Sequence, residues 1–322
     1  MRCRSRHARH PNDPVRSAQP ARRATGTQCS RPSLTVRAAR YIPRPLKTRV
    51  RQWQAATRLA WIERFHAFSD EELLAALRSL GVVPGDVLMV HASFACFAGF
   101  KGNVRDAIRV LQLAITEQGA LLMPTLPFSG TALEYVASVP VTDLKRVPSH
   151  MGLLSDMFRR MRDVTRSIHP THPVAGWGRR AAALLDEHAA AGTPCGVHSP
   201  FHKLLEADGK ILLAGVTVAA LTFYHCIEEL LEPHLPVRPF TERTYELKTL
   251  DTQGVLHLTR TRLYDSTVSA RRFGDPMVEP LKRRGCWQET RVGRLPLVVL
   301  RAREVLQTVE NMAREGVFCY RP

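Results

Sequence analysis

The chain has 322 residues, of which 44% are hydrophobic, so it can bury a proper core and is not disordered as a whole. Its formal charge of +17 is concentrated at one end: residues 1–60 hold 15 of the 46 Lys and Arg and one of the 29 acids, which leaves +3 for residues 61–322. The nearly neutral charge of residues 61–322 predicts no nucleic-acid-binding surface in the folded part. The sequence has no run of about 18 apolar residues, which predicts neither a membrane span nor a secretory signal.

The first segment, residues 1–51, is rich in Arg and Pro and has scarcely any apolar periodicity, which predicts disorder. Three explanations are open: an organelle transit peptide, a basic arm that binds an anionic partner through phosphate charge, or an extension upstream of the true start. Four prolines before residue 35 disfavour the amphipathic helix of a transit peptide. The folded domain is predicted to cover residues 52–322.

The first element of that domain is a predicted helix over residues 70–80. Ser69 and Glu72 have the spacing of a capping box, leucines recur on one face, and Gly81 is typical of a helix end. A Pro-Gly-Asp turn leads into residues 87–93, a continuous apolar run that ends in small and polar residues. This pattern predicts a buried strand.

Helical and strand patterns then alternate, which predicts a layered α/β domain. The predicted strands cover residues 120–126 and 210–216, and the predicted helices cover residues 103–115, 149–161, 177–188, 221–232 and 302–316. From about residue 241 the pattern changes to two alternating strands around a turn at residues 251–254, which predicts an antiparallel edge or a small subdomain.

Small and polar residues follow three of the predicted strands, in segments 91–103, 124–130 and 216–229. Ligands of α/β sheets bind beyond the carboxyl ends of the strands, so these segments are predicted to share one site. Gly99 and Gly102 would let a phosphate-bearing chain approach the backbone, and the following helix offers an anion-binding N-terminus. The segment matches neither a P-loop nor a GxGxxG fingerprint.

The segment RSIHPTHPVAGWG, residues 166–178, places His169 and His172 three residues apart. One hypothesis is a metal site, with further ligands from among Cys195, His198, His202, His225 and Cys226. A second is a histidine base, which needs a partner to fix its tautomer, and HCIEE places His225 and Glu228 on one helical face. The third is that each histidine is a hydrogen-bonded core or surface residue.

The cysteines are odd in number and widely spaced, at Cys3, Cys29, Cys96, Cys195, Cys226, Cys286 and Cys319. This usage predicts a reduced, cytoplasmic protein. Neither a CxxC nor an HExxH spacing occurs, which disfavours zinc. A nucleophilic Cys96 or Cys226 beside a histidine is an alternative, but both lie in apolar stretches that are typical of inert thiols.

Six stretches of the body form a recognisable set when they are taken together. They are PGDVLMVHASF with GFKGN, GALLMPTL, VPSHMGLLSDMFRR, RSIHPTHPVAGWG, GVHSPFHKLLEADGKILLAGV and LTFYHCIEE. In this order, between about residues 69 and 310, the chain resembles the aminoglycoside 3-N-acetyltransferase family. The resemblance implies a layered α/β/α domain with a central, partly mixed sheet and a small C-terminal antiparallel element, distinct from the GNAT fold.

The activity that the resemblance implies is transfer of acetyl from acetyl-CoA, without a metal, to an amine of an aminoglycoside or related amino-sugar, at the 3-amino group. His172 would remove a proton from the amine, Glu228 would polarise His172, and Thr222 or backbone N–H groups would stabilise the thioester oxyanion. The implied CoA-binding residues are Ser93, Phe94, Gly99, Gly102, Ser149, Met151 and Gly152. The implied acceptor-binding residues are Asp143, His169, His225 and Glu229.

The chain departs from the family pattern at three places. It has Gly102-Asn103 for Gly-Gly, Pro173 for Ser, and Leu221-Thr222 for Asn-Thr. His172 and Glu228 are retained, so the chemistry is expected to be retained as well.

The acceptor is less defined than the chemistry. A polycationic antibiotic needs several facing carboxylates, for which Asp143, Glu229 and Glu232 are candidates in a slightly basic body. A biosynthetic amino-sugar or another amine stays open as the acceptor, as does a CoA-binding homologue without activity. The expected partner is a small-molecule amine, with no membrane or nucleic acid, and a homodimer is the assembly considered.

Overall fold

The computed structural model describes residues 44–321. Residues 1–43, which make up most of the segment predicted to be disordered, and residue 322 lie outside the described residues. Helix α2 (Arg44–Phe65) includes residues 44–51, which the sequence pattern assigned to that segment. Pro45 falls in its first turn, where a missing N–H is tolerated, and no proline follows within the helix.

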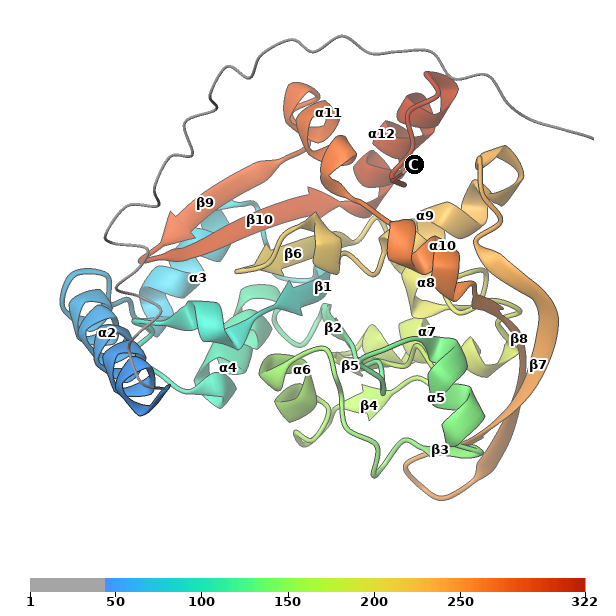
Figure 1. Cartoon of the computed structure of the whole chain (residues 1–322), viewed down its shortest axis with the longest axis horizontal. Helices are drawn as coiled ribbons and strands as arrows, with labels where there is room; N and C mark the ends of the chain where they lie inside the picture. The colour runs from blue at the N-terminus through green and yellow to red at the C-terminus, as the bar shows by residue number, and fades with distance from the viewer. Residues whose placement is uncertain (1–43, 322) are drawn as a thin grey trace, which may run out of the picture. The chain divides into compact units, whose positions relative to one another are not determined.

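Residues from Gln54 onward form one compact unit around a seven-stranded mixed sheet. The strand order is β4-β5-β2-β1-β6-β10-β9. The strands are β1 (Val87–Ala92), β2 (Ala120–Pro124), β4 (Thr165–Arg166), β5 (Val174–Trp177), β6 (Lys210–Ala214), β9 (Gln288–Val292) and β10 (Leu295–Arg301). The three central strands are parallel, and β5 and β10 pair with them antiparallel, so the predicted partly mixed sheet is confirmed (Figure 1).

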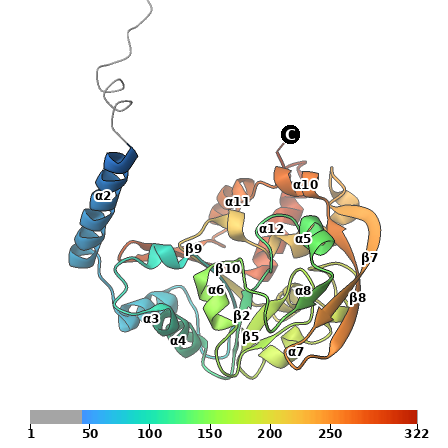
Figure 2. The ribbon, with the colours of Figure 1, turned by 60° about the horizontal axis from the view of Figure 1, so that its bottom comes forward.

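Helices cover both faces of this sheet (Figures 1 and 2). Alternate residues of each central strand enter different cores: Met89 and Leu122 join one, and Leu88 and Leu121 join the other. The second core includes residues of α3 (Asp70–Ser79), α4 (Val104–Ile115) and α6 (Leu153–Phe158). The first includes residues of α7 (Ala181–Leu185), α8 (Pro200–Glu206), α9 (Tyr224–Leu230), α11 (Val278–Arg283) and α12 (Ala302–Arg314). The α/β/α layers are therefore confirmed.

A separate three-stranded sheet contains β3 (Val141–Asp143), β7 (Phe240–Leu250) and β8 (Leu256–Tyr264). The β7–β8 hairpin and its turn agree with the prediction, because Asp251 accepts from the backbone N–H groups of residues 253 and 255. This element does not end the chain, since α10 (Ser266–Arg271) and α11 lead back to β9 and β10 in the main sheet. Helix α5 (Ala132–Ser138) precedes β3.

Three predicted helices are shorter than expected, and the one predicted over residues 221–232 is reduced to α9. The prediction of a helix over residues 177–188 is wrong at its start. Trp177 is the last residue of β5, and α7 begins only at Ala181. Gly178 makes the turn between them, with a φ of +104° and so close an approach that a Cβ would lie 2.4 Å from the carbonyl oxygen of Gly119. The helix predicted over residues 149–161 is reduced to α6. Short 3-10 turns lie at Phe94–Phe97, His188–Ala190, Val218–Ala220, Glu232–His234 and Asp275–Met277.

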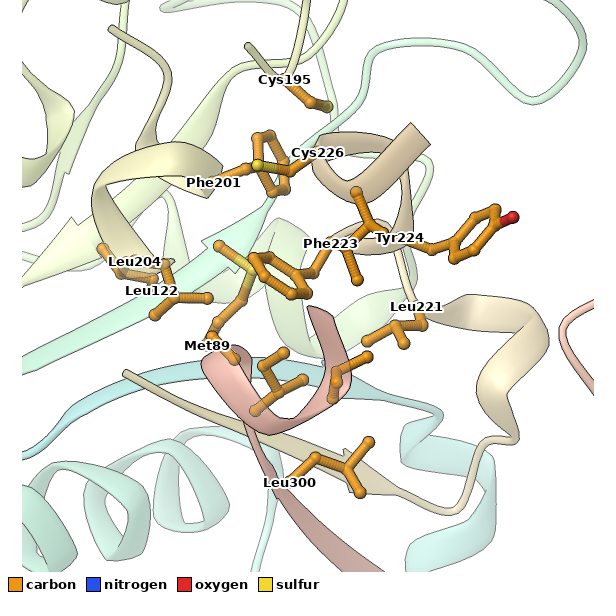
Figure 3. Packing of buried hydrophobic residues seen from close by; sticks show 14 of the residues in the cluster. Met89, Leu122, Cys195, Phe201, Leu204, Leu221, Phe223, Tyr224, Cys226 and Leu300 are labelled. Atoms are coloured by element: carbon orange, nitrogen blue, oxygen red, sulfur yellow. The ribbon is translucent and has the colours of Figure 1, made fainter. Parts of the chain in front are cut away.

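The first core extends beneath α9, where Phe223 packs among the side chains drawn in Figure 3. Phe223 is fully buried and immediately precedes α9. We expect Phe223→Ala to lower the free energy of unfolding by about 3–5 kcal/mol, because it leaves a cavity as well as losing apolar burial. Urea unfolding would measure this, with Leu230→Ala as control, since Leu230 is an exposed residue at the end of α9. Equal losses in the two variants would contradict the packing described here.

No helix among the described residues is both long enough and apolar enough to cross a membrane.

Candidate active site

His225 and Glu228 form the central pair of the candidate site. Both belong to α9, and their spacing places them on one helical face, as the sequence predicts. Nδ1 of His225 lies 2.7 Å from Oε2 of Glu228, whose side chain is fully buried. A carboxylate in this position favours a proton on Nδ1 of His225, which leaves the lone pair on Nε2.

Two further side chains complete the surroundings of the Glu228 carboxylate. Nε of Arg272 donates to both carboxylate oxygens, at 2.7 and 2.8 Å, and the hydroxyl of Tyr320 donates to Oε1. Burial by itself would raise the pKa of Glu228, but the hydrogen bond from His225 and the charge of Arg272 outweigh it and hold that pKa below its ordinary value. Burial and Arg272 lower the pKa of His225, and Glu228 opposes them. At neutral pH the pair is therefore a carboxylate and a neutral imidazole, which can accept a proton.

His172 lies beside this pair. Its buried side chain places Nδ1 2.9 Å from the hydroxyl oxygen of Thr171, and its ring centroid lies 6.3 Å from that of His225. The ring of Tyr264 contacts both imidazoles, with its centroid 5.6 Å from that of His172 and 4.7 Å from that of His225. The structure therefore pairs Glu228 with His225, which lies one helical turn before it in α9. The resemblance implied His172 as the partner of Glu228.

His169 shapes the loop that precedes β5. The ring is fully buried, and its Nδ1 accepts the backbone N–H groups of Thr171 at 3.2 Å and His172 at 3.1 Å. It stacks on His188 at 4.6 Å between centroids, and Nδ1 of His188 lies 2.8 Å from the hydroxyl of Ser167. A ring buried in this way holds the loop, and the acceptor-binding role that the resemblance implied for His169 stays a prediction.

Two other buried histidines make stability depend on pH. Burial lowers the pKa of His91 and of His188 to about 4. Between that value and the ordinary value of about 6.5 the unfolded chain binds protons that the folded chain does not, so acidification favours unfolding. We expect the free energy of unfolding to fall by on the order of 3 kcal/mol for each histidine as pH falls from 7 toward 4.

Urea unfolding at several pH values would measure this dependence. The variant His91→Leu should show a shallower decline, because leucine takes up no proton in the unfolded chain. The substitution removes no hydrogen bond from Nε2 of His91, which has no partner. Parallel declines in the variant and the parent chain would contradict the assignment.

Two adjoining cavities open onto the His225–Glu228 pair. The smaller, of about 160 Å³, includes His172, His225 and Arg272 in its wall. The larger, of about 580 Å³, includes His225, Arg272 and Thr222. Because His225 and Arg272 belong to both walls, the imidazole lies where the two cavities meet.

The residues predicted for the CoA channel lie in two neighbouring loops. Ser93 and Phe94 directly follow β1, and Ser149, Met151 and Gly152 directly precede α6. The loops approach closely, since a Cβ on Gly152 would lie 3.5 Å from the carbonyl oxygen of the last residue of β1. Of these five residues, Met151 lines the larger cavity.

The glycines beyond β1 have packing reasons of their own. A Cβ at Gly99 would lie 2.7 Å from the carbonyl oxygen of His66, and one at Gly102 would lie 2.8 Å from a neighbouring phenylalanine ring. The N-terminus of α4 is closed by a capping box of Asn103 and Asp106. The anion site predicted at this terminus is therefore filled by the protein's own side chains.

Glu229, predicted to bind the acceptor, is engaged inside the protein. Its Oε1 accepts from the Tyr264 hydroxyl at 2.5 Å and the Cys195 N–H at 2.9 Å, and its Oε2 accepts from the Thr193 hydroxyl at 2.5 Å. Burial raises the pKa of Glu229 to about 7, against these hydrogen bonds. Its hydrogen bond with Tyr264 holds that ring beside the two imidazoles, and the acceptor-binding role implied for Glu229 stays a prediction.

The other two predicted carboxylates are also paired. Both oxygens of Glu232 accept from Arg262, at 2.8 and 2.7 Å. Asp143 lies at the end of β3, where its carboxylate accepts the backbone N–H groups of Lys145 and Arg146. A convergent set of free carboxylates, as a polycation requires, is therefore not formed by these three acids.

The structure brings in three residues that sequence reasoning missed: Tyr264, Arg272 and Tyr320. Arg272 is 44 residues from Glu228 in sequence, and Tyr320 is 92 residues from it. No local pattern marks such partners, because a topology that returns the chain end to α9 brings them together. Backbone pairing of Arg272 with Tyr320 fixes this return.

The nucleophile and metal alternatives receive no support from the described residues. Cys226 is fully buried and burial raises the pKa of its thiol, which keeps it unreactive. The exposed Cys96 lies with its Sγ 3.2 Å from the carbonyl oxygen of Gly215. Within residues 44–321, no three His, Cys, Asp or Glu side chains are grouped as a metal site.

Comparisons with known proteins agree on one family. Residues 89–314 match the family model described as Aminoglycoside 3-N-acetyltransferase. The chain is 34% identical over 157 residues to Aminoglycoside N(3)-acetyltransferase IV of Salmonella sp, an alignment that covers 49% of this chain and 57% of that enzyme. The chain thus spans little more than half the length of this curated relative.

Solved structures share the fold over most of the domain. A mutant of aminoglycoside acetyltransferase AAC(3)-IVa in complex with gentamicin superposes with a TM-score of 0.65 at 25% identity, over 80% of this chain and 93% of that one. The binary complex of AAC-IIIb with CoASH superposes with a TM-score of 0.65 at 22% identity, over 79% of this chain and 99% of that one. The match of the family model to most of the chain, together with this shared fold, shows that the chain belongs to the aminoglycoside 3-N-acetyltransferase family of acyltransferases, whose fold is not that of GNAT enzymes.

Proposed function

We propose that this protein transfers an acetyl group from acetyl-CoA to an amine of an amino-sugar-like acceptor. The observation that carries the proposal is the His225–Glu228 pair at the junction of two cavities in a chain of this family. Two proteins of similar fold form complexes with these kinds of ligand, AAC-IIIb with CoASH and an AAC(3)-IVa mutant with gentamicin, which supports a thioester donor and an amine acceptor. Both 3-N-acetylation of an aminoglycoside and acetylation of a biosynthetic amino-sugar fall within this reaction.

The reaction needs a base, because an amine is nucleophilic only when neutral. Nε2 of His225 takes the proton as the amine nitrogen attacks the thioester carbonyl. A C–N bond forms, the C–S bond breaks, and the proton passes from Nε2 to the departing CoA thiolate. Glu228 fixes the imidazole tautomer and stabilises the imidazolium formed on the way.

The neighbouring residues receive supporting roles in this proposal. His172 lines the smaller cavity and contacts the acceptor amine. Thr222 lines the larger cavity beside His225 and is assigned, with backbone N–H groups, to the oxyanion. Met151 lines the larger cavity, and in this proposal that cavity takes the thioester end of acetyl-CoA.

Release of CoA thiol from acetyl-CoA tests the proposal. Purified full-length protein would be assayed with a chromogenic thiol reagent against aminoglycosides and simple amino-sugars. The proposal predicts thiol release that requires an amine and saturates with it. Hydrolysis of acetyl-CoA that needs no amine would contradict the proposal. So would the absence of thiol release with every amine when acetyl-CoA binding is measurable.

A further inference from the structure

The wall of the smaller cavity holds a cation, Arg272, whose counter-charge Glu228 does not itself line that cavity. Among the described residues that line it, Arg272 is the charged side chain, and the rest are apolar, hydroxyl-bearing or neutral histidine residues. Glu229 and Glu232 are engaged in the protein interior and with Arg262. A polycationic acceptor would therefore meet a guanidinium and no free carboxylate among these groups.

The Arg272 guanidinium is held rigidly but is not fully used. Its Nε edge is taken by Glu228, and its plane lies over the Tyr264 ring, 4.9 Å from the centroid. Its Nη2 is buried and has no hydrogen-bond partner. A buried N–H group without an acceptor costs free energy, so an oxygen supplied by a ligand would stabilise this arrangement.

We propose that the acceptor amine carries a carboxylate or a phosphate, and that this anion binds Arg272. This inference rests on the proposed acetyl transfer and narrows its acceptor to a class that the names of the relatives do not suggest. Arginine is suited to this task because it is always charged and donates several hydrogen bonds in a fixed plane to either anion.

The geometry also limits the size of the acceptor. His225 and Arg272 both lie 2.7 Å from the one carboxylate of Glu228, so the base and the anion-binding group are close neighbours. An amine at His225 and an anion at Arg272 must therefore be separated by few bonds. The volume of about 160 Å³ for the cavity that both residues line fits such a compact acceptor.

Matched acceptors would test the inference with the unmodified full chain. One pair is glucosamine 1-phosphate and glucosamine, a second is β-alanine and β-alaninamide, and an aminoglycoside serves as the polycation. In both anionic members the amine and the anion are separated by few bonds. We expect kcat/KM for the anionic member of at least one pair to exceed that of its neutral partner about tenfold or more, the factor that about 1.4 kcal/mol produces. The two pairs separate a phosphate from a carboxylate as the recognised group.

Variants would connect the preference to Arg272. Arg272→Gln should bring the anionic-to-neutral ratio close to one, and Arg272→Lys should retain part of it. Because both acceptors of a pair share any loss through Glu228, their ratio isolates recognition of the anion. Arg321→Gln is the matched control, since Arg321 lines only the larger of the two cavities, and it should leave the ratio unchanged.

The outcomes separate failure of the inference from failure of the proposed function. Equal values within both pairs, or an aminoglycoside as the best acceptor, would overturn the inference and leave acetyl transfer standing. A rise in the KM for acetyl-CoA in Arg272→Gln with an unchanged acceptor ratio would show that Arg272 serves the CoA phosphates, which also overturns it. Absence of thiol release with every amine would overturn the proposed function itself.

Discussion

Replacing His225 with alanine should lower kcat/KM for acetyl transfer by about 10²- to 10⁴-fold, the usual contribution of a positioned general base. The imidazole lines both cavities and is oriented by a fully buried carboxylate 2.7 Å away. The loss should fall on kcat, while the dissociation constant of acetyl-CoA changes little. Steady-state thiol release and calorimetric titration with CoA would measure the two quantities.

Two other histidine variants make this test specific. His234→Ala is the matched control, because His234 is exposed and follows α9 closely in the chain. His172→Ala should chiefly raise the KM for the amine, since its ring lines the smaller cavity without contacting Glu228. Loss of kcat in His172→Ala together with a fully active His225→Ala would reverse the assignment of the base.

Replacing Glu228 with glutamine should affect both stability and turnover. The change leaves the Arg272 guanidinium buried without its counter-charge, and removing one partner of a buried ion pair costs about 3–5 kcal/mol. Turnover should also fall about tenfold or more, because the His225 imidazolium loses the charge that stabilises it. Urea unfolding and thiol release would measure the two effects.

Tyr320→Phe offers a matched control for Glu228→Gln. It removes one hydroxyl donor to the same carboxylate and leaves both charges in place, so its cost should be smaller, at about 1.5–3 kcal/mol. If Glu228→Gln were no less stable than Tyr320→Phe, the carboxylate would not carry the charge that the structure assigns to it.

Local patterns explain which parts of the fold the sequence predicted: the three central strands and the β7–β8 hairpin, but not β4, β5, β9 or β10. The capping box of Ser69 and Glu72 forms as predicted, and the apolar runs became the parallel strands β1, β2 and β6, which are covered on both faces. Strand β5 was missed because it has only four residues and contains a glycine, so it carries no alternation that a pattern could show. Its pairing with β2 is a tertiary property.

In the candidate site, too, the contacts between residues near in sequence were predictable and those between distant residues were not. The His225–Glu228 contact was predictable, because residues three apart on a helix are neighbours. The contacts of Arg272 and Tyr320 were not, since they join distant parts of the chain. Glu229 is turned inward and accepts a hydrogen bond from Tyr264. The sequence alone does not show whether such a carboxylate faces the interior or a ligand.

The most direct test of this account is the mass of the amine product after incubation with acetyl-CoA. The account predicts that an acceptor gains the mass of one acetyl group, in a one-to-one ratio with the CoA released, and that His225→Ala loses both signals together. An amine that keeps its mass while CoA is released, or acetylation that persists undiminished in His225→Ala, would contradict it.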